Sequence, residues 1–315
     1  MTRDLLLLRS GKAARGWDGP KRKRPLRDAG KRQVQRIGVW LAEHDLVPAR
    51  VVTATTERAV VSAQKALKAG GMGAQGIRRD RRLDGAKPAG ALDALRDFGA
   101  EGGLGMLVLD RKMAESLLGH LLPVAATDLG TGCMAHLRLP DDWSALAPGA
   151  ASLVDLVRPE DLPEKFLFDG PDGREWRDRP AYYYRQSAVL PYRQGEKGPE
   201  LLLIRSSKRN HWVVPKGIHD PGYSAQDSAA HEAEEEAGIL GEVAAEPLGR
   251  YEVAKWGATC TVTVYPMKVT RVLGEDRWKE RHRTRIWASP EQAVARLRDD
   301  GLRALVAAFA SASRR

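Results

Sequence analysis

Three glutamates, Glu232, Glu235 and Glu236, lie within a run of 23 residues from Gly217 to Ile239. On a helix, residues three and four apart share one face, so this spacing brings the three carboxylates together. Such crowding costs free energy unless a cation lies between the carboxylates. Divalent cations such as Mg²⁺ prefer oxygen ligands. The run therefore predicts a helix that holds one or more divalent metal ions.

The same run resembles the Nudix box, in which a glycine, three glutamates and a second glycine recur at fixed spacing. The positions that match are Gly217, Glu232, Ala233, Glu235, Glu236, Gly238 and Ile239. Upstream, the Pro-Lys-Gly entry at residues 215–217 is similar to the branch that hydrolyses diphosphoinositol polyphosphates and dinucleoside polyphosphates. Downstream, residues 278–287 resemble the distal segment of that branch. The resemblance covers roughly residues 184–310.

This resemblance implies a site that uses Mg²⁺ or Mn²⁺ to cleave a phosphoanhydride bond. It implies metal binding by Glu232, Glu235, Glu236 and Gly217, and catalytic roles for Glu232, Glu235 and, as the distal candidate for the general base, Glu280. The basic residues that we expect to clamp substrate phosphates are Lys216, Arg205 and Lys208. A solvated surface charge is the alternative interpretation for Glu280 and Arg205.

Two positions depart from the Nudix box. Tyr223 stands where the family has glutamate, and His231 stands where it has arginine. In the family this glutamate and this arginine commonly pair, so replacing both leaves no unpaired charge at either position. We therefore expect metal binding to persist and the rate of turnover to be the quantity affected. Ser224 or Asp227 is the expected N-cap of the box helix.

The N-terminal half resembles the SixA-like branch of the histidine phosphatase superfamily over roughly residues 3–162. The segments that carry this resemblance are Leu5–Gly11, Arg24–Leu26 with Gly30, and residues 51–59. That family needs two histidines, but Ser10 and Asp110 stand in their places here. A serine hydroxyl is a poor nucleophile without an adjacent base. We therefore expect a degenerate phosphatase domain that lacks its catalytic step.

Two arginines, Arg9 and Arg58, remain at the phosphate-binding positions that the histidine phosphatase resemblance implies. Two converging guanidinium groups would bind phosphate or a phosphorylated ligand, although the charge of Asp110 weakens that expectation. Two interpretations stay open for this half: a phosphate-sensing or substrate-recruiting module, or a relic that supports folding or dimer contacts.

Length and patterning predict two domains of α/β type. The two resemblances imply a three-layer histidine-phosphatase-like fold at residues 1–162 and a Nudix fold, a mixed sheet between helices, at residues 184–315. A proline-rich connector at residues 163–183 separates them. Hydrophobic alternation and helical periodicity place the main elements. The expected strands are residues 5–8, 51–53, 106–109, 134–139, 201–204, 211–214 and 259–266. The expected helices are residues 29–43, 56–68, a segment ending at 121, the box helix and 302–309.

Charge is unevenly distributed: residues 1–150 carry 25 Lys and Arg against 16 Asp and Glu, whereas residues 151–315 carry 26 against 25. The basic half favours anionic partners. We expect a phosphorylated small molecule rather than nucleic acid, because aromatic residues make up only 6% of the chain and no RNA-binding motif occurs. A homodimer is one of the oligomeric states left open.

Two cysteines far apart and the short early apolar run at residues 5–8 favour a cytoplasmic protein without a membrane segment. Three functions remain in competition. The first is a Nudix pyrophosphohydrolase acting on a nucleoside polyphosphate, a dinucleoside polyphosphate or a diphosphoinositol-like compound. The second is a protein that binds phosphorylated ligands without turnover. The third is an active phosphohistidine-type phosphatase that uses Ser10.

Overall fold

A computed structural model describes residues 3–97, 103–123, 128–143, 146–170, 173–196, 198–207 and 211–312. The chain divides into two compact units, residues 1–176 and 177–315. The division falls inside the segment expected to be a connector. That segment contains a two-stranded hairpin of β7 (Phe166–Gly170) and β8 (Gly173–Arg177), which the proline-rich composition did not predict.

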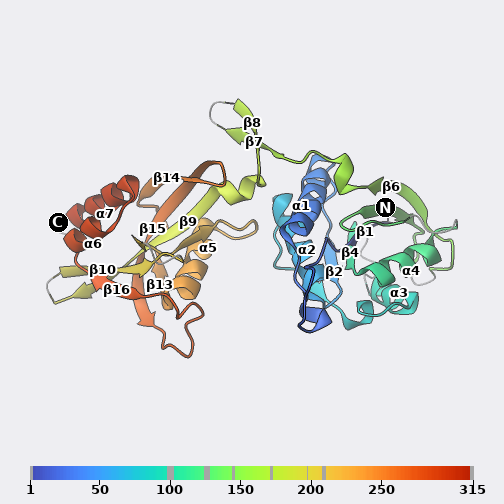
Figure 1. The fold of residues 1–315 in the computed structure, drawn as a ribbon, viewed down its shortest axis with the longest axis horizontal. Coiled ribbons are helices and arrows are strands. Elements are labelled where there is room, and N and C mark those ends of the chain that lie inside the picture. The colour runs from blue at the N-terminus through green and yellow to red at the C-terminus, as the bar shows by residue number, and fades with distance from the viewer. Residues whose placement is uncertain are drawn as a thin grey trace. The chain divides into compact units, whose positions relative to one another are not determined.

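The N-terminal unit is built on a six-stranded sheet in the order β3-β2-β4-β1-β5-β6 (Figure 1). Strands β3, β2, β4 and β1 run parallel to one another, β5 is antiparallel to β1, and β6 is antiparallel to β5. The strands are β1 (Arg3–Arg9), β2 (Arg50–Thr53), β3 (Arg78–Arg79), β4 (Gly105–Leu109), β5 (Met134–Leu139) and β6 (Ser152–Val157). The helices are α1 (Asp28–Glu43), α2 (Glu57–Ala69), α3 (Pro88–Arg96), α4 (Arg111–Leu121) and the short turns η1 (Lys21–Lys23), η2 (Arg81–Leu83) and η4 (Pro159–Asp161).

Helices cover both faces of this sheet, with α1 and α2 on one side and α3 and α4 on the other (Figure 1). Leu5, Leu6, Leu7 and Leu8 of β1 are all completely buried, as expected for a parallel strand covered on both faces. The helices α1 and α2 approach so closely that a Cβ on Gly38 would lie 1.9 Å from the Ala66 carbonyl oxygen. The expected three-layer α/β architecture is confirmed.

The C-terminal unit is built on a mixed eight-stranded sheet with the central order β11-β10-β9-β15-β13, to which β12, β14 and β16 add. The strands are β9 (Arg185–Gly195), β10 (Gly198–Arg205), β11 (Trp212–Val213), β12 (Lys216–Ile218), β13 (Ile239–Val243), β14 (Gly249–Lys255), β15 (Ala258–Val272) and β16 (Arg285–Ala288). The helical segments are η5 (Ala181–Tyr184), α5 (Ala225–Glu232), η6 (Ala233–Ala237), α6 (Pro290–Arg296) and α7 (Asp300–Ala312).

The central strand β10 serves two separate hydrophobic cores. Leu201 and Leu203 pack in the core that also contains residues of α6 and α7, whereas Leu202 and Ile204 pack in the core that contains residues of α5 and η6. This division follows from the strand geometry, in which successive side chains point to opposite faces. The sheet therefore lies between helices, as expected for a Nudix fold.

Most of the elements predicted from periodicity are present. The strand expected at residues 134–139 coincides with β5. The helix expected at 29–43 differs from α1 by one residue at its start, and the helix expected at 56–68 differs from α2 by one residue at each end. The elements that were missed include α3, α6, β6, β13, β14 and β16. Each is short or mostly polar at its surface, so the hydrophobic period extends over too few residues to be recognised.

No helix within the described ranges is long and apolar enough to cross a membrane.

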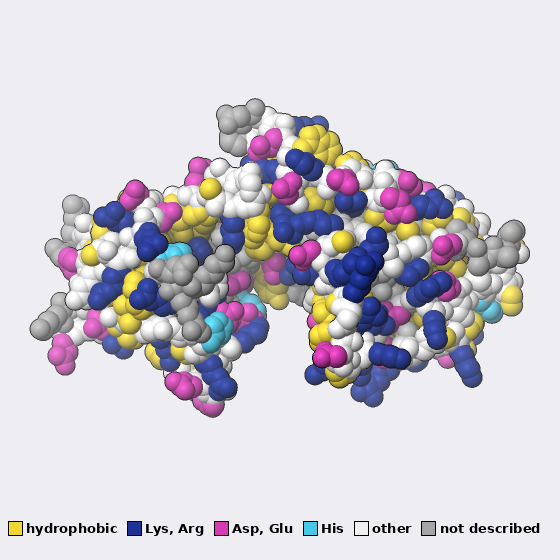
Figure 2. Space-filling view, in the orientation of Figure 1, with side chains coloured by type: hydrophobic (Ala, Val, Ile, Leu, Met, Phe, Trp, Pro, Cys, Tyr) yellow, Lys and Arg dark blue, Asp and Glu magenta, His cyan; other side chains and the backbone are white. Residues whose placement is uncertain are grey.

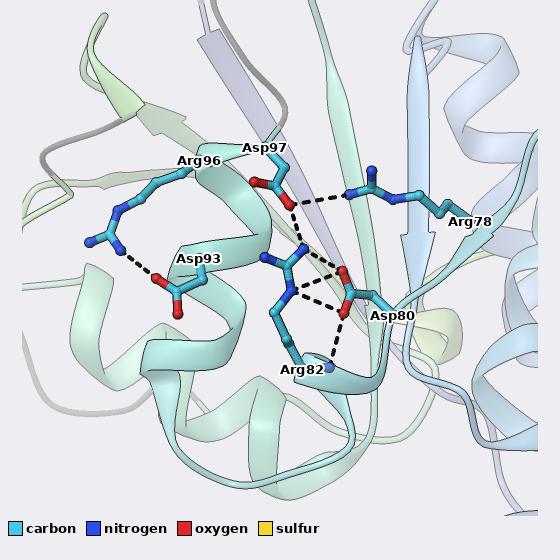
Figure 3. Close-up of polar contacts among 6 residues, drawn as sticks. All are labelled: Arg78, Asp80, Arg82, Asp93, Arg96 and Asp97. Carbon is cyan, nitrogen blue, oxygen red and sulfur yellow. Dashed lines mark hydrogen bonds and ion pairs between the residues drawn. The ribbon is translucent and has the colours of Figure 1, made fainter.

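Acidic groups accompany many of the basic residues of the N-terminal unit. On the face seen in Figure 2, Lys and Arg side chains of this unit are interspersed with Asp and Glu. Around η2, the Arg82 guanidinium bonds to both Asp80 and Asp97, and Arg78 lies 4.0 Å from Asp97 (Figure 3). Asp80 also caps η2 by accepting the Arg82 backbone N–H. These arginines therefore serve local structure, which reduces the charge left for an anionic partner.

Candidate functional site

The glutamate run is helical but not one continuous α-helix. Ser224 caps α5 by accepting the backbone N–H of Asp227 at 2.9 Å, so one of the two expected N-caps is confirmed. The next turn, η6, is a π-helix that ends at Gly238, which has a left-handed backbone with φ +61°. π-helical turns are often found at functional sites. A Cβ on Gly238 would meet the Trp278 ring at 2.6 Å, so glycine is required there for backbone and space alike.

Glu232 is the last residue of α5 and lies directly against the loop that enters the box. A Cβ on Gly217 would meet its Oε1 at 1.9 Å, so the absence of a side chain at Gly217 makes room for this carboxylate. Burial, followed by the charges of Glu236 and Glu235, raises the pKa of Glu232 to about 7. The carboxylates are therefore close enough to repel one another, as their spacing predicted.

Glu236 is held by two donors. The backbone N–H of Lys216 donates to its Oε2 at 3.1 Å, and Arg283 donates to its Oε1 at 2.6 Å. Burial raises the pKa of Glu236, and these two donors oppose that rise. Glu234, in the same turn, is exposed, in agreement with the expectation that it points away from the other glutamates.

Arg283 joins the box to the distal segment. Its side chain is only 7% exposed, and its Nε donates to Glu280 at 2.5 Å while its terminal nitrogens contact Glu236 and, at 3.3 Å, the Arg205 carbonyl. The Glu280 backbone N–H also donates to the Glu235 carbonyl at 3.1 Å. The structure thus brings the distal candidate Glu280 beside the box glutamates. Arg283 was not predicted to have a role, although it lies in the basic run 281–285 that follows Glu280.

Glu235 is more exposed than Glu236, with 27% of its side chain accessible against 14%. Its Oε1 pairs with Lys279, which lies in the distal segment, and with His231 Nε2 at 3.0 Å. His231 therefore contacts Glu235, one turn away on its own helix. Tyr223 is 48% exposed, and its carbonyl accepts a hydrogen bond from His219 Nε2 at 2.9 Å. The two residues that depart from the box thus have separate local partners in the structure.

The chemistry of this donor set fits a hard divalent cation, because several carboxylates converge, and burial together with the charges of Glu236 and Glu235 raises the pKa of Glu232 to about 7. In the arrangement shown, however, no three acidic, histidine or cysteine groups within the described ranges are gathered as metal ligands. Lys279 and Arg283 neutralise Glu235 and Glu236 instead. Lys279 is 66% exposed, so exchanging its ammonium for a metal ion costs little.

The residues expected to bind substrate phosphates have different surroundings. Lys216 lies on β12 beside the box carboxylates, and its backbone supports Glu236. The Arg205 guanidinium stacks over the Trp212 ring at 4.2 Å. Lys208 lies outside the described residues.

We expect the stability of the metal-free protein to fall as pH rises through the range in which Glu232 ionises. The folded state holds the Glu232 proton up to a pKa of about 7, above its ordinary value of 4.5, so protonation favours folding below that range and the benefit is lost as pH rises. At 1.36 kcal/mol per pKa unit, the loss between pH 5 and 7 amounts to about 3 kcal/mol at most.

Urea unfolding in EDTA at several pH values measures this dependence on the transition of the C-terminal unit. The Glu232→Gln variant is the control, because it keeps the side-chain shape and removes the ionisation. A wild-type pH dependence equal to that of the variant would contradict the assignment.

The residues compared with histidine phosphatases form a second cluster at the carboxyl ends of β1, β2 and β4. Asp110, which follows β4, accepts bonds from Ser10 Oγ at 3.2 Å, Thr56 Oγ1 at 3.3 Å and Arg58 Nε at 2.7 Å. A second Arg58 nitrogen also donates to it. Arg9 is engaged elsewhere: it donates to the Leu129 carbonyl at 2.5 Å and lies 3.9 Å from Glu115. The structure therefore joins Arg58 with Ser10 and Asp110, whereas Arg9 makes its contacts with Leu129 and Glu115 outside this cluster.

Comparison with known proteins bears on both units. The NUDIX domain family model matches residues 184–309. Among curated proteins, the chain is 33% identical over 108 residues to "Nudix hydrolase 17, mitochondrial" of Arabidopsis thaliana, an alignment covering 32% of this chain and 55% of that protein. It is 31% identical over 146 residues to "Nudix hydrolase 12, mitochondrial" of the same plant, covering 38% and 71%. The chain belongs to the Nudix hydrolase family.

A third relative is "Diphosphoinositol polyphosphate phosphohydrolase 3-beta" of Bos taurus, 33% identical over 119 residues that cover 36% of this chain and 70% of that protein. Among solved structures, residues of this chain superpose on the protein histidine phosphatase SixA with tungstate (16% identity, TM-score 0.43, covering 50% of this chain and 98% of that one). They also superpose on a C. elegans Ap4A hydrolase (21% identity, TM-score 0.36, covering 41% and 96%).

Proposed function

We propose that the protein is a metal-dependent pyrophosphohydrolase that cleaves a phosphoanhydride bond of a highly phosphorylated small molecule in its C-terminal unit. The observation that carries this proposal is that Glu232, Glu235 and Glu236 lie close enough to repel one another, with Glu280 beside them and the buried Arg283 bridging Glu236 and Glu280. Family membership supports the reaction class, and the geometry supports the division of roles among these residues.

Glu232, Glu235 and Glu236 are the residues that would hold Mg²⁺ or Mn²⁺, beside the backbone of Gly217. When bound, such an ion neutralises phosphate charge and lowers the pKa of water. Glu280 is the candidate general base: it lies at the edge of the cluster, 31% exposed, where it can accept a proton from an attacking water. Lys216, whose charge acts on Glu236, supplies positive charge for the phosphates of the substrate, whereas the Arg205 guanidinium stacks on Trp212 at the opposite core.

The substrate class is a polyanion with adjacent phosphates: a diphosphoinositol-like compound, a dinucleoside polyphosphate or a nucleoside polyphosphate. The name of the bovine relative supports the first of these. The positive charge of Lys216 beside the cluster suits all three substrate classes, because each carries several negative charges.

A screen of phosphate and pyrophosphate release tests this proposal on the full chain. Substrates would include diphosphoinositol phosphates, diadenosine polyphosphates, nucleoside triphosphates and ADP-ribose, each with Mg²⁺, Mn²⁺ or EDTA. We expect turnover of at least one polyphosphate with metal and its loss in EDTA. Absence of turnover throughout, together with measurable substrate binding, would favour the alternative of a binding protein, in which Lys279 and Arg283 permanently replace the metal.

We further propose that the N-terminal unit is catalytically inactive. The Ser10 hydroxyl donates to Asp110, and that carboxylate is already paired with Arg58, so it is a weak base for activating Ser10. An active phosphatase that uses Ser10 would instead release phosphate in EDTA and lose that activity in Ser10→Ala. Both cysteines are buried and free, which is compatible with the cytoplasmic location that we propose.

A further inference from the structure

The N-terminal unit contains a set of donors that all point at one carboxylate. Asp110 accepts two bonds from the Arg58 guanidinium and one each from the hydroxyls of Ser10 and Thr56. The Asp110 and Arg58 side chains are 17% and 22% exposed, and Ser10 and Thr56 are 5% and 7% exposed. A planar guanidinium with two parallel bonds, supported by hydroxyls, is an arrangement that also suits the oxygens of phosphate.

The order of the strands explains why these side chains meet. In the sheet, β4 lies between β2 and β1, so Asp110, which follows β4, is flanked by the loops that follow the other two strands. Ser10 follows β1, and Thr56 with Arg58 follows β2 at the start of α2. The carboxyl ends of parallel strands are where open α/β sheets bind ligands.

The Asp110 carboxylate is not used for its own helix. Asp110 is the N-cap residue of α4, but its side chain makes no capping hydrogen bond. An N-cap aspartate ordinarily accepts the N–H groups of the first turn. Here the side chain instead points to the two hydroxyls and to Arg58, whose positive charge it pairs with.

We propose that Asp110 is a built-in anion that fills an oxyanion site in the N-terminal unit. While its carboxylate is present, the site takes up no free phosphate. A phosphate ion would have to displace the Asp110 carboxylate, which is covalently attached to the chain, and would be repelled by its negative charge. Removing the carboxylate converts the pocket into a site for inorganic phosphate or a phosphomonoester. This proposal concerns the N-terminal unit and is independent of the hydrolase activity proposed above.

Phosphate binding by the full chain tests the proposal, by titration calorimetry in EDTA so that no divalent metal contributes. Asp110→Ser removes the carboxylate and leaves space, whereas exposed Asp141→Ser makes the same change in net charge away from the pocket. We expect Asp110→Ser to bind phosphate at least about tenfold more tightly than the wild type and Asp141→Ser, a factor that corresponds to about 1.4 kcal/mol. Adding Arg58→Gln to Asp110→Ser should abolish the gain.

A stability measurement keeps the test decisive if Asp110→Ser folds poorly, since removing one partner of a shielded ion pair is costly. Asp110→Ala is a second variant that removes the carboxylate and leaves space. Phosphate should raise the midpoint of thermal unfolding of the N-terminal unit in either variant but not in the wild type. Wild-type binding as tight as that of Asp110→Ser and lost in Arg58→Gln would overturn the proposal, as would folded Asp110 variants that bind no phosphate.

Discussion

Glutamine in place of Glu235 is expected to lower kcat/KM by about a hundredfold or more, because electrostatic groups aimed at the reacting phosphate contribute factors of that order. Glu235 is the box carboxylate whose present partners, Lys279 and His231, are both largely exposed. It is therefore the carboxylate most easily released to bind a metal ion. The amide keeps the size of the side chain but removes the charge that a hard cation requires.

The chain offers a matched control one position away. Glu234 lies in the same π-helical turn but is exposed, so Glu234→Gln makes the same chemical change without touching the cluster. Metal-dependent turnover and Mn²⁺ binding should be retained in Glu234→Gln and weakened in Glu235→Gln. Equal activity of the two variants would remove Glu235 from the proposed site, even if the wild type proves to be a hydrolase.

Replacing Arg283 by methionine is expected to destabilise the C-terminal unit and to reduce turnover together. The arginine is the buried partner of both Glu236 and Glu280, so its loss leaves two shielded carboxylates without their counter-charge. Removing one partner of a buried pair typically costs about 3–5 kcal/mol. Because Glu280 is partly exposed, we expect about 3 kcal/mol in urea unfolding in EDTA.

Arg283→Lys separates charge from geometry. An ammonium group restores the positive charge, but a single point donor does not reproduce the planar fork that reaches both carboxylates. We expect Arg283→Lys to recover most of the stability and only part of kcat, with Mn²⁺ affinity intermediate. If both variants kept the stability, kcat and Mn²⁺ affinity of the wild type, the bridge between Glu236 and Glu280 would have no functional role.

The sequence was sufficient for the architecture and for the membership of the carboxylate cluster. Short runs of consecutive apolar residues predict β1 and β10, and the interval from Glu232 to Glu236 predicts that the carboxylates share one face of a helix. It also identified Ser224 as one of two possible caps, since short side-chain oxygens favour that position. These features depend on neighbours along the chain, which sequence patterns report directly.

The partners of the carboxylates were not predictable, because they come from distant segments. Lys279 and Arg283 lie more than 40 positions from the glutamates that they neutralise, and a basic run alone does not reveal which member turns inward. Likewise, Asp110 was recognised as a replacement for histidine, but only the strand order shows that its carboxylate meets Arg58. The π-helical turn was also missed, because it depends on contacts at Gly238 and on the distal segment.

Strand β10 contributes side chains to both hydrophobic cores of the C-terminal unit, so it couples the two faces of the sheet into one cooperative element. Leu201 and Leu203 stabilise the side that carries α6 and α7, while Leu202 and Ile204 stabilise the side that carries the glutamates. A slip of β10 by one residue would exchange the two sets and spoil both cores at once. Packing of β10 on the α6 and α7 side therefore also restricts motion on the glutamate side. We expect the amide protons of β10 to be among the slowest in the unit to exchange with solvent.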